Sequence, residues 1–317
     1  MAKHGVDFHM KEKILNMLKK KNEVVSGEKL SSELGVSRVS IWKHIRSLQD
    51  AGYDIVSHPR GYQLVSSHDA LFPWEFPGRT PNMHYFTQTS STMDAARQLA
   101  RDGCPQFTVV VAERQSNGRG RLQRSWYSSE GGLYFTTVLR PRLPPVLSFR
   151  VNFCASLVLA RQLRQMFDIP ATVKWPNDIL VGTRKLCGML SEMEAESDAV
   201  SFVNIGIGLN VNNDPTPDEP RAVSLKTLLG REVSRKDILR RFLDEFEHQV
   251  THRIHEDVIP EWKTYTSTLN QQVRIVTVRE TTEGLAVDVD DTGALVLKLA
   301  DGSLKKIIYG DCFYRDR

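Results

Sequence analysis

Apolar residues recur at helical spacing in three short stretches near the start of the chain. The three stripes consist of Ile14, Leu15 and Leu18, of Leu30 and Leu34, and of Ile41, Ile45 and Leu48. Ser26 and Ser37 stand just before the second and third stripes, where a side-chain oxygen accepts from a free backbone N–H. Gly35 suits the left-handed exit of a helix. The pattern therefore predicts a helix-turn-helix whose last helix ends at Ala51-Gly52.

The pattern changes to alternation after this third helix. Residues 54–64 alternate and turn at Pro59-Arg60-Gly61, which predicts a β-hairpin wing. The outward face of the third helix and the hairpin turn carry candidate contacts to base edges and phosphates, namely Ser37, Arg38, Ser40, Lys43, Arg46 and Arg60. Residues 1–65 are thus predicted to be a DNA-binding winged helix, and a small helical protein-interaction domain is the alternative.

Residues 66–82 lose this periodicity and contain several prolines, so we expect a linker between domains. The aromatic residues Phe72, Trp74 and Phe76 of this segment are expected to dock onto a neighbouring part of the chain.

Helical and strand patterns are mixed over residues 83–268. Ser91 and Thr92 open an amphipathic helix that stops at Gly103, and a long apolar helix spans 149–167. Strands are predicted over 107–112, 133–139, near 174–175, and over 186–193 and 200–211. Another helix covers 235–256, and alternating segments over 269–317 predict a small five-stranded SH3-like barrel. The predicted class is α+β, with a largely β core in the central domain.

The charge distribution adds a reason to expect a nucleic-acid partner. Residues 1–60 hold 11 Lys and Arg against 7 Asp and Glu, so the whole net charge of +4 lies in this segment. No apolar run of membrane-spanning length and no signal peptide are visible, and the four cysteines are scattered. We therefore expect a cytoplasmic protein with reduced thiols, without a zinc site or a membrane partner.

Candidate chemistry is concentrated in four short motifs. In Gln115-Ser-Asn-Gly-Arg-Gly-Arg-Leu-Gln-Arg-Ser-Trp126, glycines let the backbone approach a ligand and arginines offer forks for carboxylate or phosphate oxygens. The others are Lys174-Trp-Pro-Asn-Asp178, Arg184-Lys-Leu-Cys-Gly188 and Gly206-Ile-Gly-Leu-Asn210. Basic glycine-arginine turns also occur in RNA-binding segments, so the first motif alone would be weak evidence.

Together, in this order and spacing, the four motifs resemble those of the biotin–protein ligase family. With the winged helix in front, the chain resembles the bifunctional members that are also biotin operon repressors. Two positions depart from the family pattern: Met93 stands where an asparagine is frequent, and Gln123 where a glycine is frequent. The first departure puts one polar contact to biotin in doubt.

The resemblance implies the activity of a biotin–[acetyl-CoA-carboxylase] ligase. Biotin attacks the α-phosphate of ATP, with Mg²⁺, to give biotinyl-5′-adenylate and pyrophosphate, and a lysine of the carrier protein then displaces AMP. Because a carboxylate must approach a polyphosphate, cationic side chains are needed and no covalent nucleophile is.

The resemblance also implies roles for individual residues. Catalysis is assigned to Lys185, Arg119, Arg121 and Asp178, the last of which organises Mg²⁺ or orients the attacking amine. Biotin contacts are assigned to Ser91, Thr92, Gln115, Arg119, Arg121, Lys185, Gly188, Gly206 and Gly208. ATP and adenylate contacts are assigned to Arg121, Arg124, Trp126, Asn177, Lys185 and Asn210.

The expected partners are a biotin carboxyl carrier protein, operator DNA and a second copy of the chain, paired when biotinyl-5′-adenylate is bound. Three alternatives remain at this point: a lipoate-type ligase, a biotin-sensing regulator without ligase activity, and a ligase that no longer binds DNA. The expected domains are residues 1–65, the linker 66–82, a catalytic domain at 83–268 and the C-terminal domain at 269–317.

Overall fold

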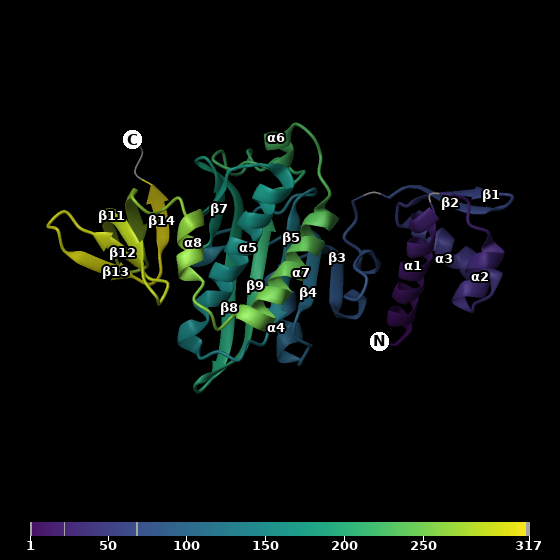
Figure 1. Ribbon diagram of the computed structural model, residues 1–317, viewed down its shortest axis with the longest axis horizontal. Coiled ribbons are helices and arrows are strands. Elements are labelled where there is room, and N and C mark those ends of the chain that lie inside the picture. Colours follow the sequence, from purple (N-terminus) through teal and green to yellow (C-terminus); the bar gives the residue numbers. More distant parts are fainter. Residues whose placement is uncertain (1, 22, 68, 315–317) are drawn as a thin grey trace. The chain divides into compact units, whose positions relative to one another are not determined.

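The computed structural model describes residues 2–21, 23–67 and 69–314, which form two compact units (Figure 1). Unit 1 contains Met1–Tyr85 and Ser234–Lys236, and unit 2 contains Phe86–Val233 and Asp237–Arg317. The predicted C-terminal domain and most of the predicted catalytic domain lie in unit 2, whereas residues 83–85 and 234–236 of the latter belong to unit 1.

Unit 1 is a three-helix cluster followed by a hairpin. Its elements are α1 (Ala2–Lys21), α2 (Gly27–Leu34), α3 (Arg38–Asp50), β1 (Asp54–His58) and β2 (Gly61–Ser66). The three predicted apolar stripes face its core, where all of their residues except the half-buried Leu34 are buried. Ser26 Oγ accepts from Lys29 N at 3.1 Å, Ser37 Oγ accepts from Ser40 N at 3.2 Å, and Gly35 ends α2 at φ 66°. The predicted winged helix-turn-helix is confirmed.

The segment predicted to be a linker contributes to the core of unit 1. It forms two 3₁₀ turns, η1 (Pro73–Glu75) and η2 (Thr80–Asn82). Phe72 stacks on Trp74 with ring centroids 4.5 Å apart. The Trp74 indole donates to the Tyr53 hydroxyl at 2.9 Å, and this hydroxyl donates to Glu75 Oε1 at 2.5 Å. Glu75 is 2% exposed and also contacts Lys19, so the segment brings a buried charge into the unit.

A seven-stranded sheet forms the centre of unit 2. Its strand order is β3 (Met83–Thr89), β4 (Thr108–Gln115), β5 (Leu133–Leu139), β9 (Ala199–Leu209), β8 (Arg184–Glu196), β7 (Asp178–Val181) and β6 (Ala171–Lys174). The pairs from β4 through β6 are antiparallel. The predicted strands are confirmed, whereas the sequence pattern did not identify β3 and did not separate β6 from β7.

Helices cover both faces of this sheet. On one face, Ala96 and Ala100 of α4 (Thr92–Arg101) pack with Val110, Val138 and Phe202. On the other face lie α5 (Phe149–Phe167) and α7 (Arg235–Arg253), where Phe135 meets Phe242 edge-on at 5.4 Å (Figure 1). The short helices α6 (Leu225–Leu229) and α8 (Ile259–Tyr265) and two further 3₁₀ turns, η3 (Arg121–Gln123) and η4 (Pro145–Leu147), complete the unit.

The stretch Pro145–Phe167 is long and apolar enough to cross a membrane by length and composition. However, 67% of its most apolar window is buried inside the protein, as expected for the core helix of a globular domain.

The C-terminal part of unit 2 is a five-stranded sheet. Its strands are β10 (Gln272–Val276), β11 (Thr281–Val289), β12 (Leu295–Lys298), β13 (Leu304–Ile307) and β14 (Asp311–Tyr314), in the order β13-β12-β11-β10-β14. The two sheets are connected through Trp175, whose indole donates to Gly293 O at 3.1 Å. The structure thus has the predicted α+β class.

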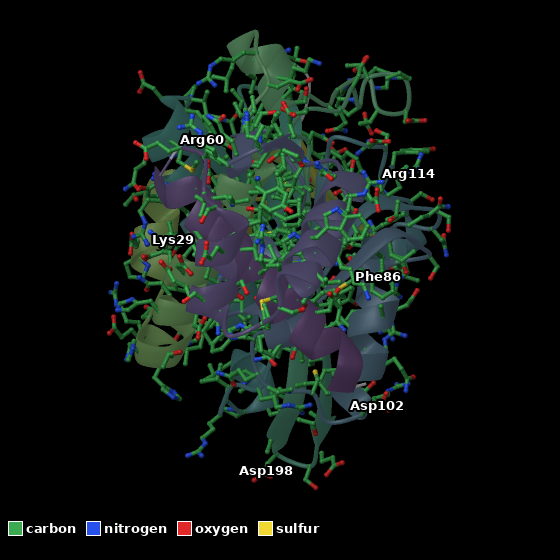
Figure 2. The ribbon with its side chains drawn as sticks, turned by 90° about the vertical axis from the view of Figure 1, so that its right-hand side faces the viewer. Lys29, Arg60, Phe86, Asp102, Arg114 and Asp198 are labelled. Atoms are coloured by element: carbon green, nitrogen blue, oxygen red, sulfur yellow. The ribbon has the colours of Figure 1, made fainter. Side chains whose placement is uncertain are left out.

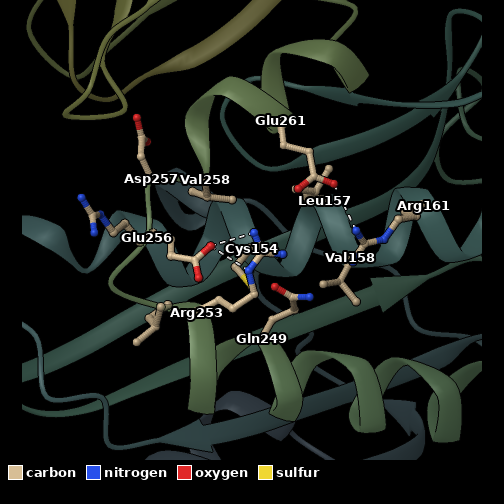
Figure 3. A pocket seen from close by; sticks show the side chains of 12 residues that line it. Cys154, Leu157, Val158, Arg161, Gln249, Arg253, Glu256, Asp257, Val258 and Glu261 are labelled. Carbon is tan, nitrogen blue, oxygen red and sulfur yellow. Dashed lines mark hydrogen bonds and ion pairs between the residues drawn. The ribbon is translucent and has the colours of Figure 1, made fainter.

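A hollow lies between α5, the end of α7 and α8, on the side of the sheet opposite α4 (Figure 3). Cys154 lines it together with Arg161 and Glu261, which pair at 3.1 Å. None of the site residues predicted from the sequence lines this hollow.

Candidate functional site

The start of α4 forms a hydrogen-bonded polar group with the end of β4. Gln115 Oε1 accepts from Thr92 N at 2.8 Å and from Thr92 Oγ1 at 3.1 Å. Thr136 Oγ1 donates to Thr92 Oγ1 at 2.9 Å, and Gln115 Nε2 donates to Ser128 Oγ at 2.8 Å. Ser91 caps α4 by accepting from Met93 N at 3.2 Å. The structure therefore brings Ser91, Thr92 and Gln115 together, as the sequence predicted.

Three glycines form a floor beside this polar group. Gly188 of β8 pairs directly with Gly208 of β9, and Gly206 pairs with Thr136 of β5. A Cβ on Gly208 would lie 2.3 Å from Trp126 Nε1, and a Cβ on Gly188 would lie 2.8 Å from the same indole. A Cβ on Gly206 would lie 2.6 Å from Met93 Sδ. In the structure the floor is therefore covered by Trp126 and Met93, two side chains for which only glycine leaves room.

The arginines of the 115–126 loop surround this floor. Arg119 pairs with Asp94 and Glu192, each at 3.1 Å. Arg121 donates to Gly310 O at 3.0 Å and to Asn177 Oδ1 at 3.4 Å. Arg124 pairs with Asp311 at 2.7 Å. The C-terminal sheet thus holds two arginines of the loop from its β14 end.

Lys185 contacts a carboxylate and the indole that covers the floor. Its Nζ lies 2.8 Å from Asp178 Oδ1 and 5.3 Å from the centre of the Trp126 ring. The pKa of Arg121 lies below its ordinary value, because the effect of burial outweighs that of the nearby carboxylates Asp311 and Asp178, which raise it. A partly desolvated cluster of cations can exchange its carboxylate partners for the oxygens of an anionic ligand.

The two asparagines predicted to contact adenine are already hydrogen bonded. Asn177 donates to Met189 O, and the Asn210 side chain accepts from Asn213 Nδ2 at 3.1 Å. Asn210 is 2% exposed and helps to hold the turn after β9. Their contacts to a nucleotide stay predictions.

Sequence reasoning did not identify Thr136, Glu192, Gly310 and Asp311 as members of this site. No local pattern marks them, because each joins the site through a partner far away in the chain. The two loop residues anchored by β14 are 189 and 187 positions away from their partners.

Metal binding was expected only together with the nucleotide. Among residues 2–21, 23–67 and 69–314, no three His, Cys, Asp or Glu side chains lie close enough to hold a metal ion. Asp178 offers one carboxylate at the site, and Mg²⁺ commonly takes one or two carboxylates while substrate phosphates and water supply its other ligands.

The predicted DNA-contacting residues lie on the accessible surface of unit 1. Ser37, Arg38, Lys43 and Arg46 are exposed along α3, while Ser40 is half-buried. Arg60 is exposed at the tip of the β1–β2 hairpin (Figure 2). Val39 (63%) and Trp42 (52%) of α3 are exposed as well. Both fall outside the buried stripe, but neither was among the predicted contacts. Apolar groups on such a helix can contact thymine methyl groups.

Comparisons with known proteins agree for all three parts of the chain. Residues 85–212 match the biotin/lipoate A/B protein ligase family, residues 11–63 match an HTH domain, and residues 268–315 match the biotin protein ligase C-terminal domain.

Two kinds of relatives match most of the chain. A bifunctional ligase/repressor from Bacillus subtilis is 35% identical over 92% of this chain and 94% of its own length. The Escherichia coli protein of the same description is 27% identical over the same shares. A solved biotin protein ligase from Aquifex aeolicus, in complex with biotin and ATP, is 26% identical with a TM-score of 0.63, covering 74% of this chain and 99% of that one.

Proposed function

This chain belongs to the biotin/lipoate protein ligase family, among its bifunctional ligase/repressors, and we propose that unit 2 attaches biotin to a lysine of a carrier protein at the expense of ATP. The observation that carries the proposal is the position of Lys185, whose Nζ lies beside Trp126 and Asp178 at the edge of the Gly188–Gly208 floor.

The site supplies the charges that the first step requires. Biotin's carboxylate attacks the α-phosphorus of ATP, a carboxylate–phosphorus bond forms, and pyrophosphate leaves. Lys185 and Arg121 stabilise the negative charge on the two approaching groups, and Arg119 and Arg124 extend the cationic rim. Fixed cations in a partly desolvated site stabilise such charge more strongly than water does.

The second step needs no nucleophile from the enzyme. The ε-amine of the carrier lysine attacks the acyl carbon of the mixed anhydride, and AMP leaves with the electrons of the C–O bond. Asp178, which pairs with Lys185 at 2.8 Å, is assigned the role of orienting the attacking amine or an ATP-bound Mg²⁺. A Mg²⁺ ion held there with ATP would supply charge neutralisation to the pyrophosphate that leaves in the first step.

Recognition of biotin's neutral ureido ring is assigned to the polar group at the start of α4. Ser91, Thr92 and Gln115 present hydroxyl and amide groups next to the glycine floor, which offers space to a bicyclic ligand once Trp126 and Met93 move aside. Gly188, Gly206 and Gly208 line that floor, and Trp126 offers a stacking face to the adenine once it moves off the glycines.

A biotin-accepting carrier domain gives a direct test. The purified chain, incubated with that domain, ATP, Mg²⁺ and biotin, is expected to raise the carrier's mass by one biotinyl group, as measured by mass spectrometry. A parallel reaction with lipoate decides between the two substrates. A mass gain with lipoate alone would replace biotin in the proposal, and no gain with either would leave a sensor without ligase activity.

Unit 1 is assigned operator binding. The exposed α3 face and the wing place Arg38, Lys43, Arg46 and Arg60 where they can meet a duplex. Expression of biotin-synthesis genes is the expected target of repression.

Arg38→Ala is expected to weaken binding to the promoter DNA of these genes by about tenfold, because it removes a guanidinium group that contacts a base edge or a phosphate. Fluorescence anisotropy at fixed salt measures the effect. Arg279→Ala removes an exposed arginine of unit 2 and serves as the matched control. Equal affinity of the Arg38→Ala and wild-type proteins would contradict the assigned DNA face.

Operator binding by a pair of winged helices requires a second copy of the chain. We expect biotinyl-5′-adenylate to order the Arg119–Arg124 loop and to promote pairing of unit 2. Sedimentation velocity should show a monomer without ligands and a dimer with biotin and ATP. A monomer under both conditions would contradict ligand-driven pairing.

A further inference from the structure

Asn204 lies on the ligand-facing side of the sheet, in line with the glycine floor. It precedes Gly206 and Gly208 by two and four residues on β9, so all three face the same side. That side carries α4, because the missing Cβ of Gly206 would meet Met93. Across the sheet, Asn204 pairs with Val138 of β5 and Glu192 of β8. Asn204 therefore stands at the inner end of the floor.

The Asn204 amide is buried without hydrogen bonds. The residue is 0% exposed, and neither Nδ2 nor Oδ1 has a hydrogen-bond partner among the described residues. Of the buried side chains described, it is the one that leaves both a donor and an acceptor unpaired. Native proteins rarely bury a polar pair in this way unless a ligand or a bound water completes it.

One neighbouring cation of this site also keeps an unpaired donor. Glu192, directly across from Asn204, accepts from Arg97 at 2.8 Å and from Arg119 at 3.1 Å. Arg119 keeps its buried Nε without a partner. Met93 covers Gly206 and brings no strong donor or acceptor to this end of the floor. The Asn204 amide and Arg119 Nε thus both lack partners, and Glu192 lies directly across from the first and is bonded to the second.

From this placement we propose that Asn204 is a biotin-contacting specificity residue, whose side-chain amide pairs with the N–H and C=O edge of the ureido ring. The inference rests on the proposed function and identifies one further contact of the same site. A primary amide offers one acceptor and two donors side by side, which complements the donor and acceptor on one edge of a cyclic urea. The flexible Met93 side chain moves off Gly206 when the ring enters.

Asn204→Val tests the contact in the full-length protein, with biotin affinity measured by isothermal titration calorimetry. We expect at least about a tenfold loss of affinity, as for a lost pair of neutral hydrogen bonds. In the ligand-free protein the same change removes an unpaired buried amide, so the melting temperature of unit 2 is expected to rise by about 2–4 °C. A loss of affinity accompanied by higher stability cannot come from damage to the fold.

Thr137→Val is the matched control. Thr137 lies on β5 beside Thr136 but faces the opposite side of the sheet, and its buried Oγ1 also lacks a partner among the described residues. We expect unchanged biotin affinity for this variant. If Asn204→Val does not fold, Asn204→Ser, which shortens the side chain and keeps it polar, is expected to show the same loss.

A ligand-side comparison separates contact from indirect effects. Wild-type protein should discriminate strongly between biotin and an analogue methylated on a ureido nitrogen, and Asn204→Val should discriminate less by about tenfold. If wild type binds biotin and Asn204→Val binds it equally well, the contact is overturned and a bound water completes the amide. If wild type binds no biotin, the proposed function is overturned together with the contact.

Discussion

Lys185→Ala is expected to slow the formation of biotinyl-5′-adenylate by about 10²–10³-fold, because it removes a fixed cation from the point where carboxylate and α-phosphate meet. The Lys185 side chain is one-third exposed and paired with a single carboxylate, Asp178, so the remaining donors of its ammonium group are available to a ligand. Biotin-dependent release of pyrophosphate, measured under single-turnover conditions, reports this step directly.

Lys226→Ala provides the control for this prediction. Lys226 also forms a lysine–carboxylate pair, with Glu232 at 2.9 Å, but on the exposed surface outside the site. Its replacement should leave the rate of pyrophosphate release within a factor of about two, since an exposed ion pair contributes little to stability and this one lies outside the site. A Lys185→Ala protein that releases pyrophosphate at the wild-type rate would remove Lys185 from the mechanism.

Glu75→Ala is expected to destabilise unit 1 by about 3 kcal/mol, because it leaves the nearly buried Lys236 and the Tyr53 hydroxyl without their common acceptor, whereas Lys19 is partly exposed. Glu75 accepts from Lys19 at 2.7 Å and from Tyr53 at 2.5 Å, and it pairs with Lys236 at 3.5 Å. Hydrogen exchange of α3 peptides, followed by mass spectrometry, measures the local free energy of opening within this unit.

Glu33→Ala is the matched control, because Glu33 pairs with Lys29 at 3.5 Å and both side chains are largely exposed. Its effect should stay below about 0.5 kcal/mol. Exchange in Glu75→Ala as slow as in wild type would show that the buried pairs contribute no net stability.

The contribution of Glu75 should also depend on pH. Burial alone would raise its pKa, but hydrogen bonds from Lys19 and Tyr53 and the charges of Lys19 and Lys236 outweigh burial and hold the pKa below 4.5. A carboxyl whose folded pKa is lowered stabilises the protein above its unfolded pKa. Its contribution is therefore complete above about pH 4.5 and is lost as the pH falls through the folded pKa. Glu75→Gln should lack this acid-dependent step in hydrogen exchange.

Much of the candidate site was predictable because its signals are local. The arginine loop and the Lys185 motif are contiguous stretches, and their residue types suggest anion binding before any fold is known. The family resemblance then assigned them to biotin and ATP. The contact of Met93 with the Gly206 position, by contrast, depends on how α4 lies on β9, which neither motif encodes.

The winged helix was determined by the sequence itself. Apolar spacing, serine caps and the Gly35 exit act between residues that are close in the sequence. They therefore stabilise the same helices whatever the rest of the chain does. The long helix at 149–167 was predicted at its observed bounds for the same reason.

Only the tertiary structure decided which distant groups meet. It turned the expected linker into a source of the buried Glu75, anchored Arg121 and Arg124 on β14, and left the Asn204 amide unpaired beside the glycine floor. The physical reason is that strand pairing and desolvation depend on neighbours far along the chain. The local sequence around a polar residue does not show whether its side chain will find a hydrogen-bond partner in the folded protein or will remain unpaired until a ligand binds.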